Sequence, residues 1–352
     1  MKGIKVSAGT AKGLITSLAV GALGGALFQL TGLPLAWMLG PLTANLLVSS
    51  QGLNVVIPEP LRSVFLAVMG LVLGSQVTPQ LASRVVDWPL SAILLLLGVA
   101  VSTAVAAAWY RRCGFDSVSA WFGAAPGAMT AMILLGDKCG GNPQRIAIAQ
   151  SLRVILVILF LPPLFWAYEG GSVASTSQTA ELEHGWIVLL IPLLLPLGRW
   201  LRFPTPALLF PLLVAALLSG FDIASLKLPD WGMNLMLWVL GSAIGSRFKG
   251  MTRRLFGRYL WQSGVATLLA LGSLAVFAEL IHQLVGVGRD VALLALAPGG
   301  IGEMAILAVA LNIDPVFVAF HHLLRMVALM VFAPFWARWL LRRQAADISS
   351  DK

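Results

Sequence analysis

Charged residues are scarce in this chain: Asp, Glu, Lys and Arg account for 11% of its 352 residues, against 58% for hydrophobic residues. The mean hydropathy is +0.88. A soluble globular fold is excluded, because such domains carry about 25% charged residues and could not bury this much apolar surface. Apolar runs recur along the chain, and many approach the roughly 20 helical residues that cross a bilayer. The sequence predicts an integral α-helical membrane protein surrounded by lipid.

Histidine and cysteine are rare as well, with four and two residues. Four scattered histidines do not supply the clustered ligands that a copper or di-iron centre needs. Cys113 and Cys139 lie outside any CxxC pattern. The sequence contains no Walker loop, HExxH motif or GxSxG nucleophile elbow. We therefore expect no metal, no cofactor and no enzymatic activity.

Acidic residues are outnumbered by Lys and Arg, 15 to 24, which gives a net charge of +9. In a soluble domain this excess would suggest nucleic acid as a partner. Here the basic residues cluster between apolar segments, where they orient a protein in the membrane. No segment outside the apolar runs is long enough to form a DNA-binding domain. We expect no direct binding of nucleic acid.

The chain contains an internal duplication. Residues 123–165 reappear as 295–337, so that Pro126 corresponds to Pro298 (298 − 126 = 172). Matches before this block have offsets of 170 or 171. Glycine-interrupted hydrophobic repeats of this length are typical of secondary transporters. The predicted divisions are repeat 1 over 1–168, an acidic outer linker over 169–185, repeat 2 over 186–345 and a cytoplasmic tail over 346–352.

The distribution of Lys and Arg predicts how the repeats cross the membrane. Each repeat has six apolar segments, at about 13–31, 33–50, 61–78, 88–110, 118–136 and 144–168, then 186–201, 204–220, 231–247, 259–285, 291–311 and 316–341. If all twelve crossed, the basic loop 247–258 would lie outside, against the positive-inside rule. The rule is satisfied if the fifth segment of each repeat enters and leaves on one side. Five crossings per repeat then give inverted repeats with both termini cytoplasmic.

Both fifth segments contain glycine next to proline: Pro126-Gly127 in repeat 1 and Pro298-Gly299-Gly300 in repeat 2. Proline removes a backbone donor and glycine tolerates unusual φ values, so an unbroken helix is not expected there. Non-helical backbone at membrane depth survives only where protein or a wet cavity satisfies it. We predict re-entrant segments whose breaks contribute backbone groups to a substrate site. A proline kink in a full span is the alternative.

Arg153 and Arg325 are the strongest site candidates. Each lies ten residues after the proline of an Asn-Pro or Asp-Pro pair, which is a good helix start. Ten residues rise about 15 Å, roughly half of a hydrocarbon core about 30 Å thick. An arginine at that depth is costly and rarely left unpaired. Two roles stay open: counter-charge for an anionic substrate, or saturation of the broken backbone beside it.

Three residues that occur in one repeat only are candidates for ion or proton coupling. Glu303 corresponds to Ala131 (303 − 172 = 131). It is either a cation or proton site or a carboxylate that stabilises the start of a half-helix. His321 and His322 point about 100° apart on a helix, so they cannot readily chelate one metal. One of them is a protonatable group near Arg325, or both are packed histidines.

Four segments of the chain resemble the AbrB membrane family. They are Gly-Leu-Pro-Leu-Ala-Trp-Met-Leu-Gly-Pro-Leu (32–42), Ala-Pro-Gly-Ala-Met-Thr (125–130), Gln-Ser-Leu-Arg-Val (150–154) and Ala-Pro-Gly-Gly-Ile-Gly-Glu-Met (297–304). Members of this family carry the same duplication, and the family is unrelated to the small DNA-binding regulator that shares its name. The resemblance implies a bacterial inner-membrane protein that affects expression of an AidB-type protein. The label of ammonia monooxygenase, also used for the family, finds no supporting ligands here.

The sequence as a whole predicts ten membrane-spanning helices in two inverted five-helix repeats, each with a Pro-Gly broken re-entrant segment. The expected function is secondary transport of a small anionic solute. The alternative is a non-transporting membrane regulator that acts through a partner, for which the basic loop 247–258 is the available cytoplasmic surface. Assembly into a homo-oligomer is left open.

Overall fold

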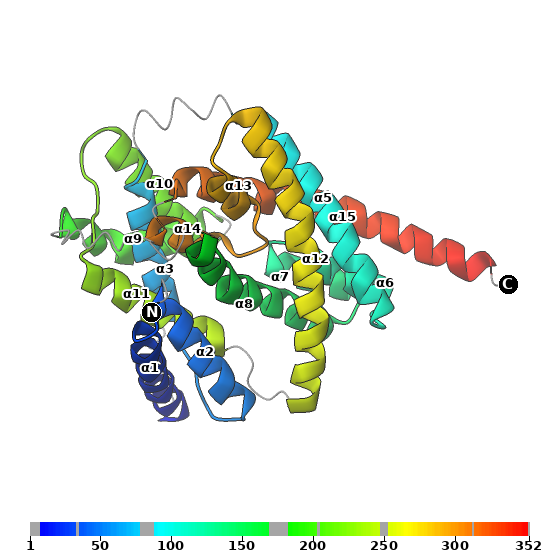
Figure 1. The fold of residues 1–352 in the computed structure, drawn as a ribbon, viewed down its shortest axis with the longest axis horizontal. Coiled ribbons are helices and arrows are strands. Elements are labelled where there is room, and N and C mark those ends of the chain that lie inside the picture. The colour runs from blue at the N-terminus through cyan, green and yellow to red at the C-terminus, as the bar shows by residue number, and fades with distance from the viewer. Residues whose placement is uncertain are drawn as a thin grey trace. The chain divides into compact units, whose positions relative to one another are not determined.

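The computed structural model describes residues 8–32, 35–77, 88–168, 182–202, 205–246, 253–311 and 313–350. These residues are almost all helical, and the one β-pairing among them is an isolated bridge between Glu183 and Lys227. Five of the described helices are long and apolar enough to cross a membrane. They are α1 (Ala8–Gln29), α5 (Pro89–Arg112), α8 (Pro143–Tyr168), α12 (Arg253–Val285) and α15 (Pro315–Ser350) (Figure 1). The prediction of an all-helical chain with apolar spanning helices is confirmed.

The shorter helices repeat at the offsets of the sequence matches. α2 (Ala36–Ser50) and α10 (Pro206–Gly220) differ by 170 at both ends (206 − 36 = 220 − 50), and α3 (Glu59–Gly74) and α11 (Asp230–Gly245) by 171 (230 − 59 = 245 − 74). α6 (Ser117–Ala124) and α7 (Met129–Lys138) correspond to α13 (Arg289–Leu296) and α14 (Ile301–Ala310) at 172 (289 − 117 = 301 − 129). In the place of α1, a 3-10 helix (Gly185–Leu190) leads into α9 (Ile191–Trp200).

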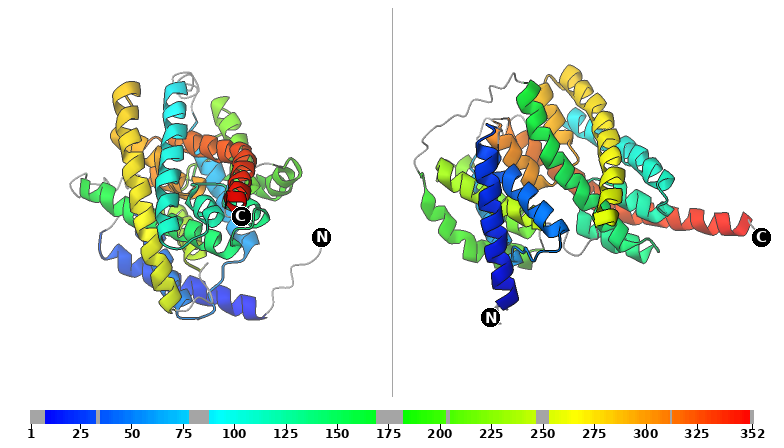
Figure 2. Two further views of the ribbon diagram at one scale, coloured as in Figure 1. Left: turned by 90° about the vertical axis from the view of Figure 1, so that its right-hand side faces the viewer. Right: turned by 60° about the horizontal axis from the view of Figure 1, so that its bottom comes forward.

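The chain forms two compact units, and each combines segments of both repeats. Unit 1 comprises Met1–Val85, Leu159–Phe256 and Ala305–Val316, and unit 2 comprises Val86–Ile158, Gly257–Met304 and Phe317–Lys352. Unit 1 therefore holds α1 to α3 together with α9 to α11. Unit 2 holds α5 to α7, α13, and most of α8, α12 and α15. Figure 2 gives two further views of these helices.

In unit 1 the repeats pack against each other through glycines, in a reciprocal pattern. A Cβ atom at each of these glycines would strike a carbonyl oxygen of the facing helix; the pairs are Gly70 with Leu208, Gly74 with Leu212, Gly241 with Met38 and Gly245 with Leu42. The partners correspond as well, since 38 + 170 = 208 and 42 + 170 = 212. Each contact is thus made twice, with the corresponding helices of the two repeats exchanged. Glycine permits the close approach of the helix backbones.

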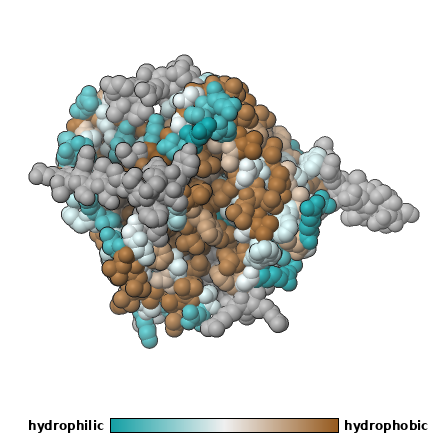
Figure 3. Space-filling view, viewed as in Figure 1, coloured by the Kyte–Doolittle hydropathy of each residue, from teal (hydrophilic) through white to brown (hydrophobic). Residues whose placement is uncertain are grey.

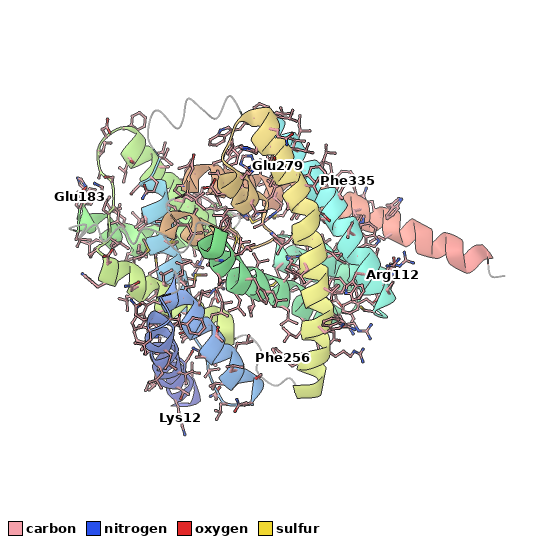
Figure 4. All side chains as sticks on the ribbon, in the orientation of Figure 1. Lys12, Arg112, Glu183, Phe256, Glu279 and Phe335 are labelled. Atoms are coloured by element: carbon pink, nitrogen blue, oxygen red, sulfur yellow. The ribbon has the colours of Figure 1, made fainter. Side chains whose placement is uncertain are left out.

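In unit 2, α5 and α12 run antiparallel and side by side (Figures 1 and 2). Gly98 packs against Phe277, and the Tyr110 hydroxyl, further along α5, donates to Ser263 Oγ at 3.3 Å. Arg112 and Glu279 lie toward opposite ends of this helix pair (Figure 4). The buried core beside it comes from α6, α7, α8 and α15; its members are Val118, Phe122, Ala125, Met132, Cys139, Ile146, Ala333, Ala337 and Leu340.

The surface is strongly apolar over broad areas of the face drawn in Figure 3. Large hydrophobic side chains stand exposed along the long helices, for example Leu23 on α1, Ile93 on α5 and Leu268 on α12. Exposed apolar area on this scale marks an interaction surface, and for long apolar helices the partner is lipid.

Candidate functional site

The fifth segment of each repeat is broken at its Pro-Gly sequence. Residues 125–128 separate α6 from α7, and residues 297–300 separate α13 from α14. Gly127 has a φ of +133° and Ala128 a left-handed φ of 48°, conformations that favour glycine and are costly for a residue with a Cβ atom. The predicted breaks are confirmed in both repeats.

The two ends of the broken segment of repeat 1 lie against each other. The backbone N–H of Asn142, which follows α7, donates to Ser119 Oγ in the first turn of α6 at 2.7 Å. Arg145 Nη1 donates at 3.0 Å to the carbonyl oxygen of Gly114, which precedes α6. After α7, the chain therefore returns to the place at which α6 began.

The helices that carry the two arginines begin as the sequence predicts. α8 and α15 each start at a proline. The residue before that proline caps the helix: Asn142 Oδ1 and Asp314 Oδ1 each accept a backbone N–H at 3.0 Å. Equal distances from these caps place Arg153 and Arg325 at equivalent points of their helices.

Arg153 binds the end of α6 and reaches the break of the other repeat. Its Nη1 donates to the carbonyl oxygens of Ala124 and Ala125, both at 3.1 Å, and its Nε donates to that of Pro298 at 3.0 Å. The side chain is buried, with 6% of its surface exposed. One guanidinium thus ties the two breaks together.

Arg325 makes the equivalent contacts in repeat 2. Its Nη1 donates to the carbonyl oxygens of Leu296 at 3.2 Å and Ala297 at 2.7 Å. These residues correspond to the Arg153 acceptors (124 + 172 = 296 and 125 + 172 = 297). Its Nη2 donates to the carbonyl oxygen of Gly299 at 2.8 Å and to His322 Nδ1 at 2.6 Å. The backbone-saturating role that the sequence left open is thus present in both repeats.

These contacts leave part of each guanidinium without a protein acceptor. Arg325, only 2% exposed, has a buried Nε with no hydrogen-bond partner among the described residues. This Nε faces the first break, since a Cβ atom at Gly127 would lie 3.8 Å from it. The ion pairs of the described chain include neither Arg153 nor Arg325. Two buried cations thus lie at the breaks without a carboxylate partner in the part of the chain that the structure describes.

Glu303 occupies the start of α14. Its carboxylate folds back over the break, because a Cβ atom at Gly300 would collide with Glu303 Oε2. It stands at the third helical position, where a glutamate reaches back to the helix start and offsets the positive end of the helix dipole. Of its two predicted roles, this geometry matches the stabilisation of the half-helix.

Both histidines are buried, with 0% of His321 and 1% of His322 exposed. Because an arginine always donates, His322 Nδ1 accepts from Arg325, and His322 Nε2 must then donate to the carbonyl oxygen of Leu294 at 3.0 Å. His321 turns to α5, where its Nε2 lies 2.9 Å from Ser91 Oγ.

Ser91 was not predicted as a site residue; it precedes its partner His321 by 230 positions. A second polar group not counted among the site candidates is Gln150 on α8. It donates to the carbonyl oxygen of Phe122 at 2.7 Å, while its buried Oε1 has no partner in the described part of the chain. In that same part, three or more His, Cys, Asp or Glu side chains do not gather as a metal site would require.

Comparison with known proteins identifies relatives of the whole chain. The family model described as AbrB, transition state regulatory protein AbrB, matches residues 37–341. The uncharacterized protein YhjN of Bacillus subtilis (strain 168) is 26% identical over 357 residues, covering 92% of this chain and 92% of that protein. The putative regulator AbrB of Escherichia coli (strain K12) is 26% identical over 334 residues, covering 89% and 92%. These names describe a regulator or an uncharacterized protein, and none describes an enzyme.

Proposed function

The chain belongs to the AbrB family, and we propose that it is a secondary transporter of a small anion. The observation that carries the proposal is the pair of buried arginines at the two helix breaks, which has no carboxylate partner among the described residues. Buried charges in a protein are paired or bind a ligand of opposite sign, because desolvation is otherwise too costly. A small anion supplies that missing charge.

The first break is the better place for the anion. There the N-terminus of α7, whose first N–H groups have no acceptor within the helix, meets the unpaired Nε of Arg325 beside Gly127. Helix N-termini favour anions. At the second break Glu303 already occupies the start of α14 and would repel one. Repeat 1 has Ala131 instead.

The proposed site uses the predicted residues in distinct ways. Arg153 and Arg325 supply charge and hold the two breaks. Pro126 and Gly127 in the first break and Pro298, Gly299 and Gly300 in the second supply non-helical backbone. Broken helices that meet at a substrate site are a common design of secondary transporters.

The proposed topology is ten crossings in two inverted repeats, with the fifth segments re-entrant. The bonds of Asn142 to Ser119 and of Arg145 to Gly114 support it, because they join the two ends of α6–α7. A fusion reporter at position 175 should report the outer side and one at 252 the cytoplasmic side. The reverse result would refute the inverted-repeat topology.

Uptake of labelled anions into proteoliposomes tests the transport proposal. The panel comprises inorganic phosphate, sulfate and small mono- and dicarboxylates. We expect the wild-type protein to accumulate at least one of them, and Arg325→Lys, which keeps the charge but loses the planar fork, to take it up at least tenfold more slowly. Arg338→Gln on the exposed part of α15 is the matched control. Equal uptake by Arg325→Lys and the control would refute the proposal that Arg325 binds the anion.

A regulatory function is the second candidate, because the E. coli relative is named a putative regulator. Its proposed partner-binding surface is the loop 247–258, of which residues 247–252 lie outside the described residues. Neutralising the loop arginines and Lys249 should abolish regulation and leave uptake intact. Regulation that survives this change would exclude the loop as the contact.

A further inference from the structure

We propose that His321, together with Ser91 and Trp88, forms a proton-binding site that couples proton movement to anion transport; the coupling rests on the proposed function. All three residues belong to unit 2. His321 lies on α15 four residues before Arg325, and Ser91 lies in the first turn of α5. The site is closed to solvent, with Ser91 and His321 0% exposed and Trp88 5% exposed.

Three short polar contacts define the site. His321 Nδ1 lies 2.8 Å from the carbonyl oxygen of Phe317, and His321 Nε2 lies 2.9 Å from Ser91 Oγ. Ser91 Oγ donates to the carbonyl oxygen of Trp88 at 2.8 Å. The backbone of Trp88 accepts a second bond, from the N–H of Ala92 at 2.9 Å.

Counting hydrogens shows that these contacts fit a protonated ring. A carbonyl oxygen only accepts, so Nδ1 must carry a hydrogen. Ser91 has one hydroxyl hydrogen, which points either at Trp88 or at His321. If it points at Trp88, Nε2 must donate to Ser91 Oγ, and the ring carries two hydrogens. All three contacts are therefore hydrogen bonds at once only when His321 is an imidazolium.

The neutral ring needs one small rearrangement. The Ser91 hydroxyl turns its hydrogen from Trp88 to Nε2, and the carbonyl oxygen of Trp88 keeps its bond from Ala92. Gain of a proton reverses this step: the proton from the aqueous phase binds Nε2, and the hydroxyl turns back to Trp88. No heavy atom has to move, so the site exchanges a proton at little cost in reorganisation.

The contacts of the neighbouring histidine, His322, fit a neutral ring. His322 Nδ1 already accepts from Arg325 at 2.6 Å. A proton on that nitrogen would break the bond and place two positive charges in contact. Of the three coupling candidates, Glu303 lies against the start of α14 and His322 is held neutral. Of these three residues, His321 is the one whose hydrogen-bond contacts fit an added proton.

Aromatic rings and the neighbouring charges set the sign of the coupling. The Phe317 ring lies 4.0 Å from the His321 ring between centroids, with the two planes tilted by 32°. The rings of Trp88 and Phe320 lie at 6.0 and 5.3 Å, and aromatic rings this close favour a cation. Among the described residues, the titratable groups near the site are His322 and Arg325 on α15, with Arg153 of α8 acting on Arg325. Ser91 on α5 and Trp88 just before it carry no charge. Asp314 caps the start of α15.

Since the nearby arginines oppose a further positive charge, an anion beside them favours protonation of His321. By linkage, the proton favours the anion equally. The expected coupling is therefore symport.

The first test measures protonation without any transported ligand. The full-length protein is labelled with 15N-histidine and reconstituted in lipid nanodiscs, and the His321→Gln variant assigns the signals. Between about pH 5 and pH 8 we expect His321 to gain its second proton while His322 stays neutral. Ser91→Ala should lower the ratio of protonated to neutral His321 about tenfold at a fixed pH. A His321 that stays neutral throughout, or His322 gaining its proton first, would overturn the proposal.

The second test measures coupling in proteoliposomes that contain a pH-sensitive dye. With an anion that the wild-type protein takes up, we expect internal acidification in step with uptake. His321→Gln should lose the acidification and the pH dependence of uptake, while His184→Gln, exposed at the outer linker, keeps both. Full acidification by His321→Gln would refute the coupling role. Absence of uptake by the wild type counts against transport itself, and the NMR result still decides whether His321 binds the proton.

Discussion

The reciprocal glycine contacts of unit 1 make a quantitative prediction for Gly70→Ala and Gly241→Ala. A Cβ atom at Gly70 would collide with the Leu208 carbonyl oxygen and lie 3.1 Å from the Leu212 backbone nitrogen. Both atoms belong to the backbone of the facing helix, so the helices must separate. Overpacking of this kind costs about 1–3 kcal/mol, against a gain of up to about 1 kcal/mol from the better helix propensity of alanine.

The expected net loss is about 1–2 kcal/mol for each variant, and it should be similar for both because the contact is the same one made twice. Gly264 and Gly272 in α12 provide matched controls, since a Cβ atom there meets no atom within 4 Å. Alanine at either control site should be neutral or stabilising by up to about 1 kcal/mol.

Thermal unfolding of the purified protein in detergent measures the difference. For a chain of 352 residues, 1 kcal/mol corresponds to roughly 1–2 °C, so Gly70→Ala and Gly241→Ala should melt about 1–4 °C below wild type. If their melting temperatures equal those of the control variants, the close contact between these helices is refuted. A large effect at only one of the two sites would show that the two contacts are not equivalent.

Three further predictions concern the site and its surroundings. Arg153→Lys should lower stability by about 2–5 kcal/mol in denaturant unfolding, because one ammonium cannot hold the three carbonyl oxygens that the guanidinium binds; a loss below about 1 kcal/mol would contradict this. Gly127→Ala should reduce anion uptake at least tenfold, whereas Gly140→Ala, also at positive φ but with open space around it, should keep uptake near wild type; equal uptake by the two would show that the break tolerates a side chain. Lys227→Gln removes an exposed ion pair with Glu183 (2.9 Å) and should change stability by less than about 1 kcal/mol, and a larger loss would mean that the pair anchors the linker.

Much of the helix pattern follows from the sequence. The Pro-Gly pairs predicted breaks in both fifth segments, and the Asn-Pro and Asp-Pro pairs predicted the starts of α8 and α15. These features depend on local backbone chemistry: proline lacks a backbone N–H, glycine permits unusual φ values, and Asn or Asp caps a helix start. The charge and the spacing of Arg153 and Arg325 likewise predicted that they are site residues, because a buried arginine at membrane depth is energetically costly unless it is paired.

The pairing between helices was beyond sequence reasoning. The offset of 171 relates Gly70 to Gly241 (241 − 70 = 171), but it does not show which helices these glycines face. The His321–Ser91 bond joins helices far apart in the chain, and Ser91 lies in an otherwise apolar run. The sequence also divided the chain by its repeats, whereas the compact units mix the two repeats. Such contacts depend on tertiary packing, and the hydrophobic periodicity of a single sequence does not show which helices face each other.

The central claim, that Arg153 and Arg325 form an anion site in a transporter, is tested most directly by uptake of the labelled anion panel into proteoliposomes. The account predicts that the wild-type protein and Arg338→Gln accumulate the same anion, and that Arg325→Lys, purified as a folded protein, takes it up at least tenfold more slowly. Uptake by folded Arg325→Lys at the wild-type rate would contradict the claim, as would a wild-type protein that takes up no anion of the panel.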